Sequence, residues 1–136
     1  MRPRSVLVLC LLLFLGGQMG GCGLFGIGGD DSPPNSPTGL SADSEDSAIV
    51  LDWQTVQAGD LSGYNVYRST SSLADISGRT PVNNEGPISE GNYTDDTVEN
   101  GTSYHYKVTA VDEAGNESDP SNEVRKTPFS DPPDRP

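Results

Sequence analysis

A nine-residue run, residues 103–111, alternates apolar and polar side chains almost without interruption. Successive side chains of a β-strand point to opposite faces, so a period of two indicates a strand with one buried face. No stretch of the chain shows a convincing helical period. The run predicts a strand whose buried face is formed by Tyr104, Tyr106, Val108 and Ala110.

Two further segments follow the same rule, residues 48–53 and residues 63–69. Turn-forming residues separate these runs, as in 58–60, 83–86, 99–101 and 113–116. Short strands with turn signals at this spacing are typical of an all-β sandwich or barrel. The inward side chains of the two segments would be Ile49, Leu51, Trp53, Tyr64 and Val66.

A series of short motifs then appears in a fixed order: Pro37-Thr-Gly-Leu40, Trp53, Gly63-Tyr-Asn-Val-Tyr67, Asn92-Tyr-Thr-Asp95, residues 100–110, residues 112–118 and residues 121–128. In order and spacing these motifs resemble a fibronectin type III domain, over residues 37–128. The resemblance implies an immunoglobulin-like, seven-stranded β-sandwich.

The core expected for such a sandwich is centred on Trp53, the largest apolar side chain available. Tyr104 follows a turn, where its phenol can bond back to the preceding loop as in a tyrosine corner. The remaining core positions are expected at Leu40, Ile49, Leu51, Tyr64, Val66, Tyr93, Val98, Tyr106, Val108 and Ala110.

The N-terminal segment, residues 1–21, differs in character from the rest. Arg2 and Arg4 precede an unbroken apolar run over residues 6–15. That run is too short to cross a bilayer as a helix, which needs about 20 residues. It fits the apolar region of a secretory signal, so we exclude it from the fold.

Cys22 follows the signal within a glycine-rich stretch. Cys10 lies inside the apolar run, so its removal with the signal leaves Cys22 as the single thiol. A disulfide within the mature chain is then excluded. Zinc sites need three or four ligands, and a catalytic cysteine needs a partner base, neither of which this stretch supplies.

Small residues stand directly before this cysteine, with Met19 three places ahead of it and then Gly20 and Gly21. Residues 1–22 are thus similar to a bacterial lipoprotein signal, although that family usually has leucine where Met19 stands. The resemblance implies a diacylglyceryl lipid on the Cys22 sulfur and cleavage before Cys22. Ordinary secretion, with cleavage among the glycines, is the alternative. Gly23 in place of aspartate favours the outer membrane in a diderm cell.

The sequence therefore divides into four parts: a signal (1–21), a lipidated cysteine with a tether (22–36), the domain (37–128) and a tail (129–136). Glycine and proline dominate the tether and proline the tail, so we expect both to be disordered.

The charge of the chain limits its partners. Removing residues 1–21 takes away two arginines and no acid, so 6 basic and 20 acidic residues remain and the formal charge falls from −12 to −14. Binding nucleic acid or anionic head groups requires clusters of lysine and arginine. We expect no nucleic-acid partner and a monomeric protein.

No residue pattern favours catalysis or a metal. His105 is out of phase with the core tyrosines and is expected to face solvent. Asp95 and Asp96 are expected to cap a turn, and the acids around Asp112 to form a turn without a calcium ion. Tyr67 points away from the core and is a candidate exposed aromatic for a sugar or a protein.

These observations predict a non-catalytic cell-envelope lipoprotein that displays one binding or spacer module. Its partner would be a protein or polysaccharide of the envelope, and no cofactor is expected beyond the lipid. The alternative is an accessory, docking subunit of an envelope enzyme or secretion complex.

Overall fold

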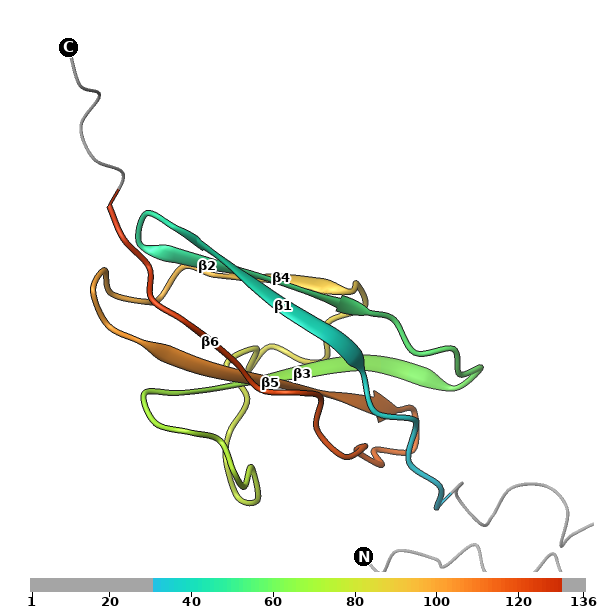
Figure 1. Cartoon of the computed structure of the whole chain (residues 1–136). Helices are drawn as coiled ribbons and strands as arrows, with labels where there is room; N and C mark the ends of the chain where they lie inside the picture. Colours follow the sequence, from blue (N-terminus) through green and yellow to red (C-terminus); the bar gives the residue numbers. More distant parts are fainter. Residues whose placement is uncertain (1–30, 131–136) are drawn as a thin grey trace, which may run out of the picture.

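A computed structural model describes residues 31–130 of the chain, and in this part it contains six β-strands and no helix (Figure 1). No helix long and apolar enough to cross a membrane occurs in that part. The signal, Cys22, most of the tether and residues 131–136 lie outside the described residues. The strands are β1 (Thr38–Glu45), β2 (Ala48–Gln54), β3 (Leu61–Ser69), β4 (Asn92–Asp95), β5 (Tyr104–Asp112) and β6 (Val124–Lys126).

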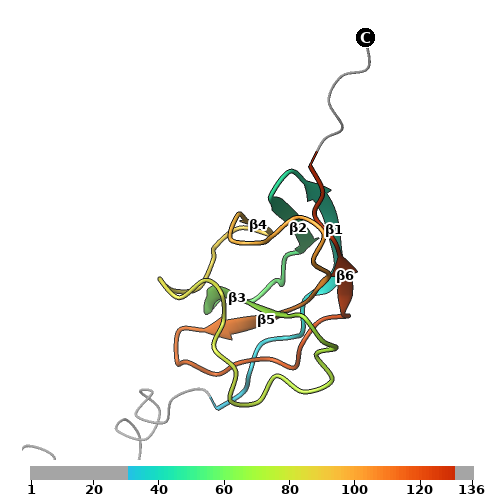
Figure 2. The same ribbon diagram turned by 90° about the vertical axis from the view of Figure 1, so that its left-hand side faces the viewer.

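The strands form two antiparallel three-stranded sheets, in the orders β1-β2-β4 and β3-β5-β6. The sheets lie as two layers, seen along their edges in Figure 2. The all-β prediction is confirmed. In β2, β3 and β5 the side chains that the alternation predicts to be inward are buried, and the clearest case is β5, where every apolar position from Tyr104 to Ala110 is buried.

The space between the layers is filled by the side chains that the alternation places inward. Trp53 of β2 contacts Tyr64 of β3 edge to face, with ring centroids 5.4 Å apart and planes at 68°. This contact joins the two sheets through an aromatic pair. The buried cluster between the sheets contains all six residues expected at the centre of the core, namely Trp53, Tyr64, Val66, Tyr104, Tyr106 and Val108. Tyr93 is partly buried and packs against this cluster.

One side of the sandwich is closed by hydrogen bonds between β1 and the segment that leads into and beyond β6. The amide of Asn122 bonds the backbone of Leu40 twice, accepting from its nitrogen at 3.1 Å and donating to its oxygen at 2.9 Å. The Ser44 hydroxyl donates to the Thr127 carbonyl at 2.9 Å. Figure 2 shows β1 and β6 side by side at this edge.

The seventh strand expected from the family resemblance is not formed among the described residues. Residues 70–91 are irregular, and the Asn83 side chain takes the place of a strand along β3. It accepts from the Val66 nitrogen at 2.8 Å and donates to the Tyr64 carbonyl at 3.0 Å. One backbone bridge, Tyr64 to Ile88, adds to this pairing. Pro81 and Pro87 lack amide donors, so a continuous ladder cannot form there.

Gly63 allows this irregular segment to lie against β3. Its φ is +153°, and a Cβ at this position would lie 2.6 Å from the carbonyl oxygen of Ile88. A larger residue would therefore push the segment away from the strand.

We expect Trp53→Ala to lower the free energy of unfolding by about 3–5 kcal/mol, because the change leaves a cavity at the contact between the sheets. A domain of this size has little stability to spare, so the variant should be largely unfolded at growth temperature. Chemical denaturation followed by circular dichroism measures the difference.

The neighbouring Asp52→Ala variant is the control, since Asp52 is exposed on the same strand. Its stability should differ from that of the parent by no more than about 0.5 kcal/mol. A cooperative transition of Trp53→Ala at the parent's midpoint would contradict the packing described here.

Candidate functional site

The most buried charged group of the described residues is the carboxylate of Asp95 at the end of β4. Its side chain is 1% exposed and faces the space between the sheets. Arg68 of β3 donates to its two oxygens at 2.9 and 2.7 Å, and the Tyr106 hydroxyl of β5 donates at 2.9 Å. Thr97 adds its hydroxyl at 2.7 Å and its backbone nitrogen at 3.1 Å. Asp95 therefore ties one sheet to two strands of the other.

The pKa values of this cluster follow from burial and from these donors. Burial alone would raise the pKa of Asp95, but hydrogen bonds from Thr97, Tyr106 and Arg68 outweigh it and hold that pKa below its ordinary value. Burial, and then the charge of Asp95, raise the pKa of the Tyr106 phenol. Asp95 thus stays ionised with both oxygens occupied, which makes it an acceptor that holds the fold.

The position of Asp95 corrects the sequence-based interpretation. Asp95 and Asp96 were both expected to cap a turn in solvent. Asp96 is exposed, whereas Asp95 lies on the inner face of β4, in register with Ile49 of β2. The sequence did contain a signal for this position. Tyr93 was assigned to the core, and Asp95, two residues later on the same strand, lies on the same face. The cation that neutralises Asp95 lies 27 residues away in sequence and has no local signature.

Tyr104 forms the tyrosine corner that its position predicted. Its hydroxyl accepts a hydrogen bond from the Glu99 backbone nitrogen at 3.0 Å. The Arg68 guanidinium lies 5.3 Å from the centre of its ring, a cation–π contact. The same arginine thus bonds Asp95 and covers Tyr104, so the corner and the buried ion pair are one connected structure.

Tyr67 is not the exposed aromatic that the sequence suggested. Its side chain is 4% exposed, and its hydroxyl donates to Oε1 of Glu117 at 2.6 Å. Burial first, and then the bond to Glu117, raise the pKa of Tyr67 to about 12. The same Glu117 oxygen accepts from Thr109 at 2.5 Å. Tyr67 lies between the irregular loop after β3 and the segment before β6 that carries Glu117, and no periodicity indicates the path of either segment.

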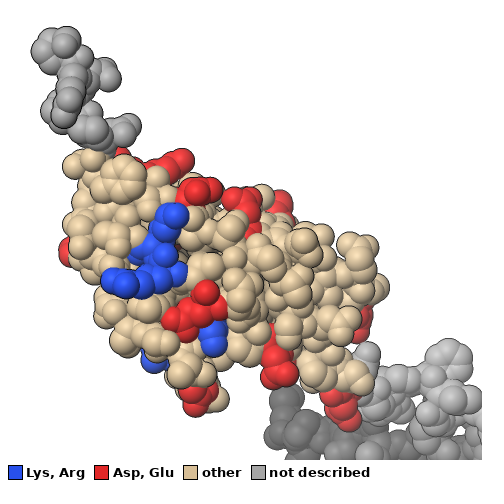
Figure 3. Space-filling model, in the orientation of Figure 1, with Lys and Arg blue, Asp and Glu red and all other residues tan. Residues whose placement is uncertain are grey.

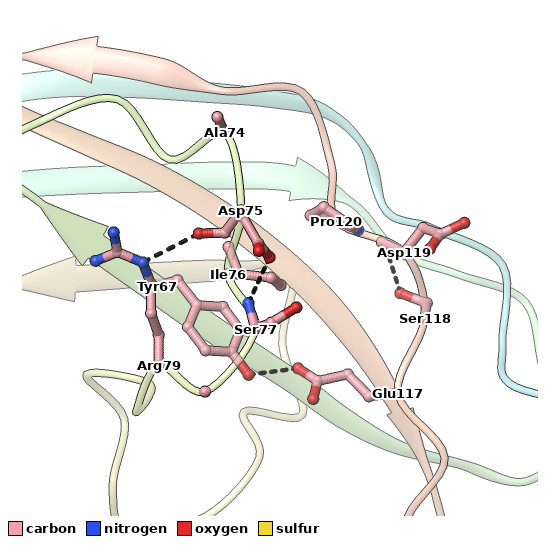
Figure 4. A pocket seen from close by; sticks show the side chains of 11 residues that line it. Tyr67, Ala74, Asp75, Ile76, Ser77, Arg79, Glu117, Ser118, Asp119 and Pro120 are labelled. Atoms are coloured by element: carbon pink, nitrogen blue, oxygen red, sulfur yellow. Dashed lines mark hydrogen bonds between the residues drawn. The ribbon is translucent and has the colours of Figure 1, made fainter.

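A hollow of about 410 Å³ remains between this loop and the segment before β6 (Figure 4). Tyr67 lies between its two walls, which are residues 74–79 and residues 117–120. The loop wall is shaped by its own bonds, from the Ser77 nitrogen to Asp75 at 2.8 Å and from Arg79 Nε to the Asp75 carbonyl at 3.1 Å. Most side chains around the hollow are exposed, so it is an open surface depression.

His105 and Glu123 hold the other end of this loop. One carboxylate oxygen of Glu123 bonds Nδ1 of His105 at 2.6 Å, and the other accepts from the Leu73 nitrogen at 3.0 Å and the Ser72 hydroxyl at 3.2 Å. Leu73 is fully buried. His105 lies on the outer face of β5 as expected, but it is paired with Glu123 and its side chain is only 18% exposed.

The remaining charges do not assemble into a metal centre. No group of three or more His, Cys, Asp or Glu suited to a metal occurs within residues 31–130. The Asp112 carboxylate accepts from the nitrogen and the side-chain amide of Asn116, at 2.8 and 2.9 Å, and so closes its own turn.

On the face shown in Figure 3, Lys and Arg gather toward one side while Asp and Glu are scattered.

The two antiparallel sheets, the tryptophan between them and the tyrosine corner define a fibronectin type III sandwich. Residues 35–127 match the family described as "Fibronectin type III domain", and the chain belongs to that family. It is also similar to a solved Fn3-like protein from Clostridium thermocellum, with 33% identity and a TM-score of 0.55, over 76% of this chain and 100% of that one.

Several other similar proteins are enzymes, and the chain matches only a small part of each. It is 39% identical to an amylopullulanase of Thermoanaerobacter thermohydrosulfuricus over 95 residues, which is 70% of this chain and 6% of that enzyme. It is 36% identical to a poly(3-hydroxybutyrate) depolymerase of Ralstonia pickettii, over 68% of this chain and 16% of that enzyme. A β-1,2-glucanase structure from Parabacteroides distasonis gives 32% identity and a TM-score of 0.50, over 73% of this chain and 14% of that one.

We expect Asp95→Asn to lower the free energy of unfolding near neutral pH by on the order of 2–3 kcal/mol. Removing one partner of a buried ion pair leaves the other uncompensated, and partial exposure of Arg68 moderates the cost. Asp96→Asn removes the same charge from an exposed position. It should change stability by no more than about 0.5 kcal/mol in urea denaturation.

The contribution of Asp95 should also depend on pH. An unfolded aspartate has a pKa of about 3.9, and folding lowers the pKa of Asp95, so its stabilisation is full above that value and is lost as the pH falls through the folded pKa. The parent should therefore lose more stability than Asp95→Asn on acidification. Parallel acid profiles of the two proteins would refute this assignment.

Proposed function

We propose that this protein is a non-catalytic lipoprotein of the bacterial cell envelope. In this proposal Cys22 carries a diacylglyceryl lipid, residues 23–36 form a tether, and the fibronectin type III domain is a spacer that holds a protein partner away from the membrane. The observation that carries the proposal is the arrangement of the chain, which enters and leaves the domain at opposite poles.

The hydrogen bonds define these poles. At the first, Thr38 at the start of β1 lies in register with Gln54 at the end of β2. At the second, the Ser44 hydroxyl bonds the Thr127 carbonyl and the Gly101 nitrogen bonds the Pro128 carbonyl at 2.8 Å. Figure 1 shows the chain entering at one end of the long axis and leaving at the other. A domain of this shape separates whatever is attached to its two ends.

The aromatic side chains support a spacer or a protein-docking role over the binding of sugars by stacking. Phe129 is the large hydrophobic side chain that is exposed among residues 31–130, at 54%. Tyr64, Tyr67, Tyr104 and Tyr106 are buried. A sugar-binding face usually presents an aromatic ring to the ligand, and Phe129 follows the last strand instead of lying on a sheet.

The relatives support a second candidate, an accessory subunit that docks on an envelope enzyme or a secretion complex. In the amylopullulanase, the matched segment makes up 6% of the enzyme. Such a segment accompanies the rest of a large enzyme, and this chain would do so as a separate polypeptide. The polysaccharide partner considered from the sequence remains an alternative.

In this proposal the protein is monomeric and is held in the outer membrane if the cell has two membranes. Secretion without an anchor is the alternative localisation. No nucleic-acid partner is expected, because the formal charge of the chain without residues 1–21 is 6 − 20 = −14 and polyanions would be repelled.

We expect Cys22→Ser to move the protein from the membrane fraction to the soluble fraction when it is expressed in a bacterial host. The lipid is the only membrane attachment in this account, and its acyl chains supply the binding free energy. Cell fractionation with immunoblotting measures the change, and mass spectrometry of the parent's N-terminus should find a diacylglyceryl-modified Cys22.

Cys10→Ser is the matched control, because Cys10 lies in the apolar run of the signal and would leave with it. Its distribution should equal that of the parent. An unlipidated N-terminus in the parent, or membrane retention of Cys22→Ser, would refute the anchor. Either result would refute the anchor without testing the spacer role of the domain, which would then have to be tested by identifying its partner.

A further inference from the structure

Three separate segments meet at the pole where the chain leaves the domain, and Asn100 connects two of them. Its side-chain oxygen accepts from the Ser47 nitrogen at 2.8 Å. Its amide nitrogen donates to Oδ1 of Asp46 at 2.7 Å and to the Ser47 hydroxyl at 3.2 Å. Asp46, Ser47 and Asn100 are called the turn clasp below. It joins the β1–β2 turn to the turn that precedes β5.

The third segment reaches the clasp through the residue after Asn100. The Gly101 nitrogen donates to the Pro128 carbonyl at 2.8 Å. This bond joins Gly101 to the segment by which the chain leaves the domain. Gly101 has a φ of +86°, and no heavy atom lies within 4 Å of the position that a Cβ would take. The backbone conformation, and not lack of space, therefore favours glycine here.

Asn100 and Gly101 form the one Asn-Gly pair of the whole sequence. An asparagine followed by glycine is chemically labile, because a glycine backbone nitrogen has no neighbouring side chain to hinder its attack on the asparagine amide. Both reacting groups are restrained here, the Asn100 amide by the turn clasp and the Gly101 nitrogen by Pro128. The folded structure thus restrains both groups that would have to react.

We propose that Asn100 is a covalent modification site, at which deamidation by water is controlled by the opening of the turn clasp. The Gly101 nitrogen loses its proton to solvent and forms a bond to Cγ of Asn100. The bond from Cγ to Nδ2 breaks, and ammonia leaves with a proton taken up from solvent. Water then opens the resulting succinimide at either carbonyl to give aspartate or isoaspartate. No oxidant, reductant or enzyme is needed.

The product cannot restore the clasp. A carboxylate at residue 100 has no N–H to donate, and its oxygen would face the Asp46 carboxylate across the present 2.7 Å contact. Two like charges at this distance repel each other, so the two turns separate. Ser47 has a φ of +57°, a conformation uncommon for a non-glycine residue, and it would lose the bond to its nitrogen. Deamidation therefore fixes the open form of this pole.

The test follows deamidation of the full chain by peptide mapping with mass spectrometry, in buffer at mildly alkaline pH. We expect Asn100 to be the first asparagine modified once the protein is unfolded in urea. Its rate in the folded protein should be lower by at least about tenfold, because the reaction then requires local opening. Chromatography separates the aspartate and isoaspartate peptides.

Two variants with equal charge changes locate the control of the reaction. Asp46→Ala removes the closer of the two acceptors of the Asn100 amide nitrogen, whereas Asp43→Ala removes an exposed carboxylate of β1 outside the clasp. We expect Asp46→Ala to deamidate several-fold faster than the parent while still folded by circular dichroism, and Asp43→Ala to match the parent. Asn100→Asp, which reproduces one product, should melt at a lower temperature than the parent.

Several results would overturn the proposal. Equal rates in the folded and unfolded parent would show that the fold does not protect Asn100. Faster modification of another asparagine in urea would remove Asn100 as the site. Equal deamidation rates for the Asp46→Ala and Asp43→Ala variants would show that the turn clasp does not control the reaction at Asn100. If Asp46→Ala fails to fold, the comparison of deamidation rates in the folded and the unfolded parent still decides whether the fold protects Asn100.

Discussion

The structure depends on a buried carboxylate that is shared between the two sheets. Asp95 belongs to the β1-β2-β4 sheet, and two of its donors, Arg68 and Tyr106, belong to the β3-β5-β6 sheet. Hydrophobic contacts between the sheets are non-directional, whereas these hydrogen bonds fix how the layers lie relative to each other. Asn122 closes the β1–β6 side of the sandwich, and Asp95 connects β4 to the opposite sheet. Trp53 and Tyr64 fill the space between them.

Much of this fold could be predicted from local pattern. The alternation along β2, β3 and β5 identified the inward side chains, and a tyrosine placed just after a turn indicated the tyrosine corner. These features depend on neighbours in sequence, because the period of a strand is fixed by its geometry. The family resemblance, confirmed by the match over residues 35–127, added the expectation that the strands pack as a sandwich.

The features that sequence reasoning missed are those that depend on distant residues. Whether Asp95 lies in solvent or in the core depends on Arg68, and the burial of Tyr67 involves Glu117 and a loop without a regular period. The absence of a seventh strand from residues 31–130 has the same origin. Asn83 supplies with its side chain the hydrogen bonds that a strand would supply with its backbone.

These corrections bear on the proposed function. Coverage of Tyr67 removes the aromatic surface that would have favoured sugar stacking, and the poles defined by β1 and residues 127–128 favour separation of the two ends of the chain. The enzymes to which the domain is similar are far longer than this chain, so their activities are not transferred to it. What the domain contributes is a stable, elongated body, and that body rests on the connection between its sheets.

The most direct test of this account is a double-mutant cycle between Arg68 and Asp95, using Arg68→Met, Asp95→Asn and the double variant in urea denaturation. If the pair joins the sheets as described, the two substitutions should be non-additive, with a coupling free energy of about 1–3 kcal/mol. Additive effects, with a coupling free energy near zero, would show that the sheets are held together without this ion pair.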